Sequence, residues 1–121
     1  MPNQMILNLD QVFHALSDPT RRAIVRRLSR GPASVSELAK PFSMAMPSLL
    51  QHLRVLESSR LIRSEKIGRV RTCQMQPSAL GQAEAWLAEQ RALWQGRVDR
   101  MQAYVGTLQG KERKHGKGHA K

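Results

Sequence analysis

The chain has 121 residues, a length typical of one domain with a single hydrophobic core. Its 20 Lys and Arg residues against 9 Asp and Glu leave a formal net charge of +11, which favours a polyanionic partner, nucleic acid before an anionic membrane surface. The single cysteine, Cys73, excludes an internal disulfide framework and a multi-cysteine zinc site within one chain.

The charge is unevenly distributed along the chain. Residues 1–78 hold twelve basic and five acidic residues, residues 79–110 hold three of each, and residues 111–121 hold five basic and one acidic. No apolar run approaches the roughly 18 residues needed to span a bilayer, and residues 1–10 lack the basic start and apolar core of a signal segment. We therefore expect no membrane partner and a cytoplasmic location.

Two helices are predicted at the start of the chain. The first is short, with an apolar stripe at three- and four-residue spacing formed by Leu9, Val12, Phe13 and Leu16. Asp18 is the expected N-cap of the second, which has Pro19 at its first position and ends at Gly31-Pro32. Ile24, Val25 and Leu28 should face inward on it. The rest of its surface is expected to carry five arginines: Arg21, Arg22, Arg26, Arg27 and Arg30.

A short capped helix and a second amphipathic helix are predicted next. Ser34 and Glu37 match the capping box that opens a helix, and Pro41 keeps that helix short. After a turn at residues 43–45, the following helix has Pro47 in its first turn. Its two sides differ in chemistry, with Leu49, Leu53 and Leu56 on one and Ser48, Gln51 and Arg54 on the other.

Between Leu61 and Met75 the helical spacing of apolar residues gives way to a pattern typical of β-strands. β-Branched and long side chains flank Gly68-Arg69, which predicts a two-stranded hairpin with the glycine at its bend. Its basic residues are Arg63, Lys66, Arg69 and Arg71. The fold class predicted is mainly α with a small β-hairpin, a winged helix-turn-helix. Its second helix would enter the major groove, and its hairpin would reach the backbone or the neighbouring minor groove.

One long helical pattern runs from Ala79 to Leu108, with Ser78 as its expected N-cap. Its apolar stripe is interrupted at Gln90 and consists of Leu80, Ala83, Leu87, Trp94, Val98, Met101, Val105 and Leu108. An exposed stripe of this length favours dimer packing over a ligand pocket. We expect one folded domain over residues 1–110 and, because large apolar residues are absent beyond it, a disordered basic tail over residues 111–121.

Several ordered motifs make the chain similar to the ArsR-type bacterial transcriptional repressors. They are LSDPTRR at residues 16–22, VSELA at 35–39, LLQHLRVLE at 49–57 and the Gly68-Arg69 wing tip. The resemblance covers residues 9–108. It implies a homodimer that binds double-stranded DNA at an inverted repeat in a promoter, with repression usually released by a ligand. The terminal helix, with Trp86, Trp94, Arg97 and Asp99, most resembles the metal-independent, autorepressor-like branch.

Two departures from the family pattern concern metal sensing and base recognition. Metal-sensing members carry cysteine pairs near the recognition helix or His and Asp ligands on the terminal helix. This chain has neither, so we expect no metal and no cofactor. Leu50 stands where members commonly place a small polar residue on the DNA-facing side, and Ala45 replaces the usual hydroxyl cap. The sequence does not identify a small-molecule inducer.

DNA contacts are expected from the second helix of the motif and from the hairpin. The predicted contact residues are Ser48, Leu50, Gln51, His52, Arg54, Lys66, Arg69 and Arg71. Within this set, Ser48 and Gln51 should contact bases or phosphates, whereas Arg54 should bind a phosphate. His52 has two interpretations, a structural hydrogen bond or a DNA contact.

Other classes of function stay open. A non-specific architectural protein would use the charge and the basic tail but would not need a capped recognition helix. A protein adaptor would use the neutral stretch at residues 79–110. An enzyme is disfavoured because the sequence has no glycine-rich phosphate loop, metal cluster or catalytic acid pair. Cys73 could sense redox state, but a lone thiol in a strand is usually a packing residue.

Overall fold

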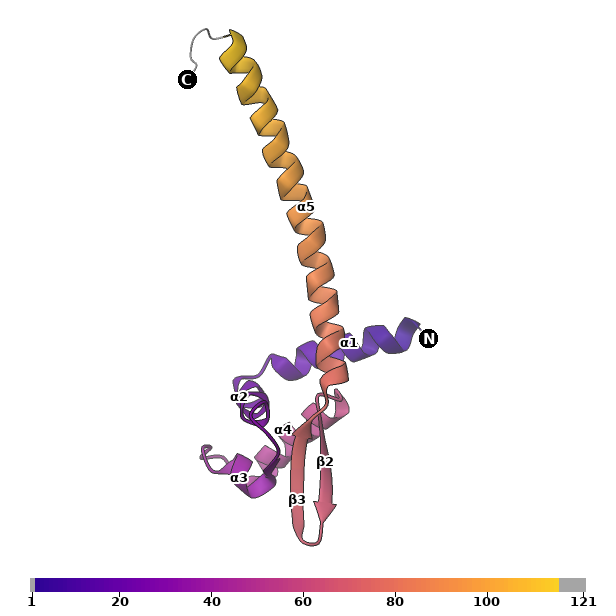
Figure 1. The fold of residues 1–121 in the computed structure, drawn as a ribbon. Helices are drawn as coiled ribbons and strands as arrows, with labels where there is room; N and C mark the ends of the chain where they lie inside the picture. Colours follow the sequence, from indigo (N-terminus) through magenta and orange to yellow (C-terminus); the bar gives the residue numbers. More distant parts are fainter. Residues whose placement is uncertain (1, 116–121) are drawn as a thin grey trace. The chain divides into compact units, whose positions relative to one another are not determined.

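The structure is a computed structural model that describes residues 2–115, with side chains described for residues 8–110. The described part contains five helices and three strands in the order α1, α2, β1, α3, α4, β2, β3 and α5 (Figure 1). Contacts divide the chain into two units, Met1–Glu84 and Ala85–Lys121. The boundary falls inside helix α5, Pro77–His115, whereas the sequence predicts one domain over residues 1–110.

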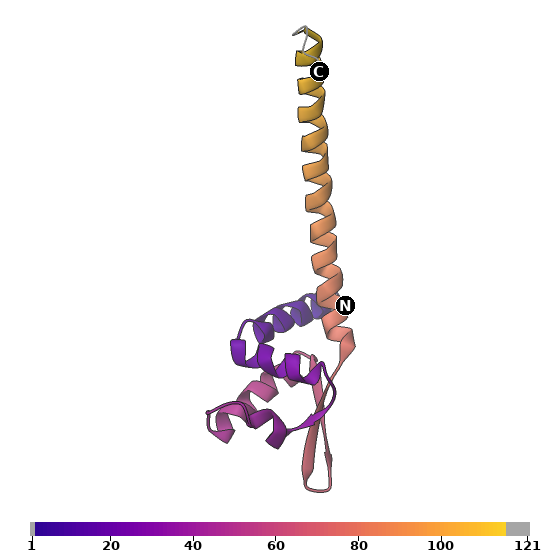
Figure 2. The ribbon, with the colours of Figure 1, turned by 60° about the vertical axis from the view of Figure 1, so that its left-hand side comes forward.

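Four helices of the first unit precede its hairpin. They are α1 (Pro2–Leu16), α2 (Pro19–Leu28), α3 (Val35–Ala39) and α4 (Met46–Ser58), and Figure 2 shows them from a second direction. Helix α1 contacts both α2 and α4, and α2 also contacts α4. Helix α1 is longer than the predicted helix over residues 9–16, because after Pro2 no proline or glycine interrupts it before Leu9.

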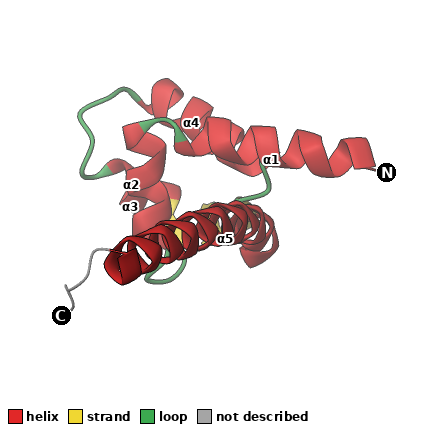
Figure 3. Cartoon of the chain, turned by 90° about the horizontal axis from the view of Figure 1, so that it is seen from above, coloured by secondary structure: helices red, strands yellow, loops and turns green. Residues whose placement is uncertain are grey.

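A three-stranded antiparallel sheet completes the first unit, in the order β1, β3, β2. The strands are β1 (Ala33–Ser34), β2 (Ile62–Ile67) and β3 (Val70–Met75), drawn in yellow in Figure 3. The predicted hairpin is confirmed, with β2 and β3 paired from Ile62 and Met75 at the base to Ile67 and Val70 at the tip. Strand β1 was not predicted, because two residues are too short to show an alternating pattern.

One hydrophobic core holds these elements together. Its buried apolar residues are Val12, Ala15, Ile24, Leu28, Ala33, Leu38, Leu49, Leu53, Leu56, Leu61, Ile62, Cys73, Ala79 and Ala83. Each helix of the unit contributes at least one of them, and the leucines of α4 are those that the sequence predicts to face inward. The fold is a winged helix-turn-helix in which α3 and α4 form the motif and β2 and β3 form the wing.

Helix α2 begins where the sequence predicts. Asp18 is its N-cap, Pro19 occupies the first turn, and the Asp18 carboxylate accepts a hydrogen bond from the Arg21 backbone amide at 3.0 Å. This bond holds the pKa of Asp18 below its ordinary value of 3.8, and the charge of Arg21 acts in the same direction. The carboxylate therefore stabilises the helix most when it is ionised.

The Asp18→Ala variant should lose about 1 kcal/mol of unfolding free energy at neutral pH, the usual contribution of an N-cap. Because the folded-state pKa is lowered, this contribution is complete above the unfolded value of 3.8 and is lost as the pH falls through the folded value. Urea unfolding of both proteins from pH 7 to pH 3 measures the difference. A difference that stayed constant below pH 4 would show that the charge of Asp18 has no part in the cap.

Helix α5 differs from its prediction at both ends. It begins at Pro77, so Ser78 lies in its first turn rather than at the N-cap. It continues to His115, past Gly110 and through residues 111–115, where the sequence predicts disorder. Lys, Glu and Arg fill residues 111–114 and are good helix formers, and one glycine is too weak to end a helix. The rest of the predicted tail, residues 116–121, lies outside the described residues.

Candidate nucleic-acid interface

The helix-turn-helix starts from a complete capping box. The Ser34 backbone amide donates to the Glu37 carboxylate at 2.8 Å, and the Glu37 amide donates to the Ser34 hydroxyl oxygen at 3.1 Å. The bond from the Ser34 amide lowers the pKa of Glu37, and the Ser34 hydroxyl acts in the same direction. The predicted capping box is therefore confirmed, and it fixes where α3 begins.

Helix α4 has one buried side and one exposed side. Leu49, Leu53 and Leu56 are buried, whereas Ser48, Gln51 and Arg54 are exposed, as the spacing predicts. Ala45 precedes the helix without a side-chain capping bond, so its first backbone amides have no side-chain partner from the cap. Leu50 is half-buried and packs against the core cluster, which turns much of its side chain away from the exposed side.

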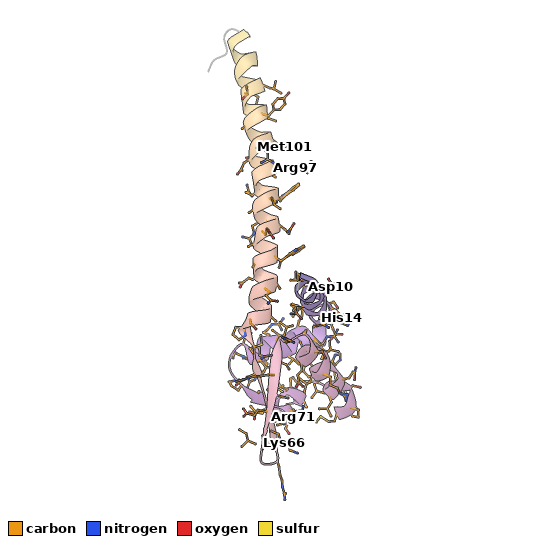
Figure 4. The ribbon with its side chains drawn as sticks, turned by 90° about the vertical axis from the view of Figure 1, so that its right-hand side faces the viewer. Asp10, His14, Lys66, Arg71, Arg97 and Met101 are labelled. Carbon is orange, nitrogen blue, oxygen red and sulfur yellow. The ribbon has the colours of Figure 1, made fainter. Side chains whose placement is uncertain are left out.

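Gln51 and Arg54 also border a groove between α4 and α1. The groove has a volume of about 550 Å³ and is lined by Asp10, Gln11, His14, Gln51, Arg54, Val55, Ser58 and Ser59. Asp10 and His14 are labelled on α1 in Figure 4. Arg54 donates to the Gln51 side-chain oxygen at 3.3 Å, an exposed contact that either side chain can exchange for a ligand. The hydrogen bond between Gln51 and Arg54 is exposed, so it does not prevent either side chain from contacting DNA.

The ring of His52 is hydrogen-bonded to Arg21, for which the prediction of a surface position was wrong. The Arg21 side chain is buried, not on the surface of α2 as predicted, and it donates through Nη1 to His52 Nδ1 at 3.1 Å. Because a guanidinium only donates, Nδ1 must be the acceptor and the ring proton must lie on Nε2. Of the two interpretations, the structure shows the structural hydrogen bond.

Arg21 also binds the end of α1. Its Nε donates to the Ala15 carbonyl at 2.8 Å and its Nη2 to the His14 carbonyl at 3.2 Å. The His14 carbonyl also accepts from the amide and the hydroxyl of Ser17. One side chain thus joins α1, α2 and α4. Spacing could have revealed this, because Arg21, Ile24 and Leu28 follow one another by three and four residues on the inward side of α2.

The basic residues of the wing that are predicted to contact DNA lie at two places, the tip of the hairpin and one of its faces. Gly68 adopts φ +64° in a two-residue turn, which leaves Arg69 exposed at the tip. Lys66 and Arg71 are directly opposite each other in the hairpin, so they share one face of it, and Figure 4 labels both. All three predicted wing contacts are exposed.

Arg71 additionally connects the wing to the recognition helix. Its Nε donates to the Ser64 hydroxyl oxygen at 3.1 Å, and that hydroxyl donates to the carboxylate of Glu57 on α4 at 2.9 Å. Arg71 Nη2 lies 3.9 Å from the other Glu57 oxygen. This chain of polar contacts, which no local sequence signal indicates, links the wing to α4.

Cys73 lies buried in β3, at the base of the wing. Burial raises the pKa of its thiol, so the protonated and unreactive form prevails at neutral pH. Within the described residues, no group of three His, Cys, Asp or Glu side chains could hold a metal ion. No helix in that part of the chain is both long and apolar enough to cross a membrane.

Comparison with known proteins identifies the family. Residues 16–65 match a family described as a helix-turn-helix domain. The crystal structure of an ArsR family transcriptional regulator, RHA00566, is 58% identical in sequence, with a TM-score of 0.70 over 73% of this chain and 91% of that one. The chain belongs to the ArsR family of transcriptional regulators.

Two further relatives of this ArsR-family chain are named transcriptional regulators. The HTH-type transcriptional regulator Rv2034 of Mycobacterium tuberculosis is 44% identical over 71 residues, which are 59% of this chain and 66% of that protein. The transcriptional repressor SdpR of Bacillus subtilis is 29% identical over 79 residues, 65% of this chain and 88% of that protein. This ArsR-family chain thus spans slightly less than two thirds of Rv2034.

Proposed function

We propose that this ArsR-family chain is a homodimeric repressor that binds an inverted-repeat operator in a promoter and blocks transcription. The observation that carries the proposal is helix α4, whose leucines are buried in the core while its polar side chains stay exposed beside a cationic wing. A helix held in this way can enter the major groove without unfolding, and the wing can bind the neighbouring backbone.

The proposed contacts fall into two groups. Ser48 and Gln51 would read base edges, because they are short or amide side chains on the exposed side of α4. Arg54, Lys66 and Arg69 would bind phosphates. Leu50, His52 and Arg71 have contacts within the protein, so their main role would be to hold the interface in place.

Pairing of two copies is proposed to use the second unit. From Trp94 to Leu108 the apolar residues follow one another by four, three, four and three residues, the spacing of a helix that packs along a partner helix. Trp94 and Met101 are 64% and 60% exposed within one chain. They line, together with Val98 and Val105, a groove of about 450 Å³ on this helix. A second copy would cover these side chains, and the dimer would offer two α4 helices to half-sites about 34 Å apart.

The proposal predicts a restricted footprint and strong salt dependence. If a dimer neutralises about eight phosphates, log K should fall with log salt at a slope near −7. A footprint confined to one palindromic site, on DNA selected by the protein from random sequence, would support the operator. Uniform coverage would instead favour the non-specific architectural protein, and failure to retard any duplex would favour the adaptor.

Variants of α4 and of the wing should have different effects on DNA binding. The Ser48→Ala, Gln51→Ala double variant should lose discrimination between the selected site and a mismatched one, because each good base contact contributes about 1–3 kcal/mol. Arg69→Ala should weaken binding to all sequences by a similar factor and reduce the salt slope by about 1. Mobility-shift titrations on both duplexes measure these effects. Unchanged discrimination in the double variant would show that other residues read the bases.

A further inference from the structure

Two large apolar side chains are exposed at the tip of the cationic wing. Ile67 and Val70 flank the turn at Gly68-Arg69 and are 68% and 53% exposed. They are directly opposite each other in the hairpin register, so both project from the same face. Together they form a small apolar patch, the tip pair, next to the charge of Arg69.

The fold provides no cover for the tip pair. Strand β1 pairs with β3 only at Cys73 and Thr72, so the hairpin beyond those residues has two strands. Among the described residues, Ile67 and Val70 belong neither to the core cluster nor to the partly buried side chains packed against it. A β-strand does not require apolar side chains at these two positions. Threonine is also β-branched and would suit an exposed strand equally well.

The alternation of side chains places the tip pair and the cations nearest to it in β2 and β3 on opposite faces of the wing. Lys66 and Arg71 are one residue further from the turn, so they project from the opposite face, the one that carries buried Cys73 at its base. The wing therefore ends in Arg69 at the turn. Behind it, Lys66 and Arg71 lie on one face, whereas the tip pair lies on the other face, followed further from the turn by Glu65 and Arg63. A DNA backbone has a matching pattern, in which charged phosphates alternate with largely apolar deoxyribose rings.

We propose that Ile67 and Val70 pack against deoxyribose rings at the edge of the groove that the wing enters, while Arg69 and Lys66 bind the adjacent phosphates. This inference rests on the proposed function and adds an uncharged contact to it. Apolar contacts with DNA have precedent, since proteins that bind the minor groove often insert apolar side chains between base steps. A second copy of the wing is a poorer partner, because Lys66, Arg69 and Arg71 would repel their counterparts.

The test uses the full chain and a duplex that the wild-type protein has selected from a random-sequence library. The Ile67→Thr, Val70→Thr double variant keeps β-branching and removes apolar surface. The matched control, Ile67→Val with Val70→Ile, exchanges the two side chains and keeps the apolar pair. Thermal unfolding of each protein establishes that the hairpin and core are intact.

The threonine variant should bind the selected duplex about tenfold more weakly, equivalent to about 1.4 kcal/mol. Its salt slope should equal that of the wild type, because no charge is removed, whereas Arg69→Ala should lower the slope. Hydroxyl-radical footprinting, which reports on deoxyribose accessibility, should show that the sugars protected at the wing lose protection in the threonine variant and keep it in the control.

Each other outcome is decisive. If the wild type binds the duplex and the threonine variant has the same affinity and sugar protection, this inference is wrong and the proposed function stands. If the control, which keeps the apolar pair, also binds more weakly, the affinity depends on the exact shape of the two side chains and not on their apolar contact with sugars. A change in oligomeric state instead of in the footprint would assign the tip pair to contacts between copies. If the wild type selects no duplex, the proposed function fails first, and this inference fails with it.

Discussion

The Arg21→Ala variant is expected to lose about 3 kcal/mol of unfolding free energy, although it changes one arginine of a helix that has several. The Arg21 side chain donates to the carbonyls of Ala15 and His14 and to the ring of His52. The residue is only 9% exposed and its bond to the Ala15 carbonyl is buried, so water has little access to the groups that Arg21 binds. Alanine would leave a buried carbonyl oxygen and an imidazole nitrogen without a donor, and such orphaned groups are costly.

Arg22→Ala is the matched control for this effect. Arg22 is adjacent in sequence and also donates to a carbonyl of α1, that of Leu16 at 2.9 Å, but it is exposed. Water can take over that bond, so the loss should stay within about 0.5 kcal/mol. Urea unfolding at one fixed protein concentration measures both variants, because the stability of a dimer depends on concentration. Equal and small losses would show that the three bonds of Arg21 contribute no more than a surface contact.

Lysine should replace Arg21 only in part. Its ammonium group carries three donors at a single point, whereas the guanidinium spreads its donors over a planar fork that reaches α1 and α4 together. Arg21→Lys should therefore recover the bond to one helix and leave the other without a partner. Weaker DNA binding by this variant at a temperature where it is fully folded would indicate that the bond to His52 also orients α4.

Elements marked by short-range signals could be predicted from the sequence. The capping box of Ser34 and Glu37, the N-cap at Asp18 and the glycine turn at Gly68 each depend on residues within a few positions of one another. The leucines of α4 follow the helical period, so the buried side of the helix was also predictable. These features are local, and together they define the winged helix-turn-helix.

Features that depend on distant residues could not be predicted. The bond between Arg21 and His52 joins residues 31 positions apart, and strand β1 exists only because Ala33 and Ser34 pair with β3. Arg71 is exposed, but its connection to Glu57 through Ser64 depends on how the wing packs against α4. Composition and periodicity do not contain this information, because they describe single segments.

In the candidate interface, too, some features could be predicted from nearby residues and others depend on distant ones. The period of α4 indicates that Ser48, Gln51 and Arg54 are exposed, but not that the last two also border a groove with α1. Leu50 follows Leu49 by about 100° around the helix, so whether it faces DNA or the core depends on what lies beside α4. The structure places it partly against the core. Which residues contact DNA therefore has to be measured by binding.

The Trp94→Glu variant is expected to weaken dimerisation by at least about 100-fold and to remove tight operator binding. A twofold interface loses the side chain from both copies, at about 1.5–3 kcal/mol for each large apolar group buried, and it gains two carboxylates in the seam. A monomer would then offer one recognition helix instead of two, so its affinity would approach that for a single half-site. Sedimentation at several protein concentrations and mobility shifts on the selected duplex measure the two effects.

Ala92→Glu is the matched control, because it adds the same charge to the same helix away from the stripe. Ala92 is two residues before Trp94, which places it about 160° around the helix on an exposed side. The control should dimerise and bind DNA like the wild type. If Trp94→Glu also remains a dimer with unchanged affinity, the interface lies elsewhere in the chain. If it becomes a monomer that still binds the operator tightly, one recognition helix and its wing suffice for binding, and the two-half-site arrangement is wrong.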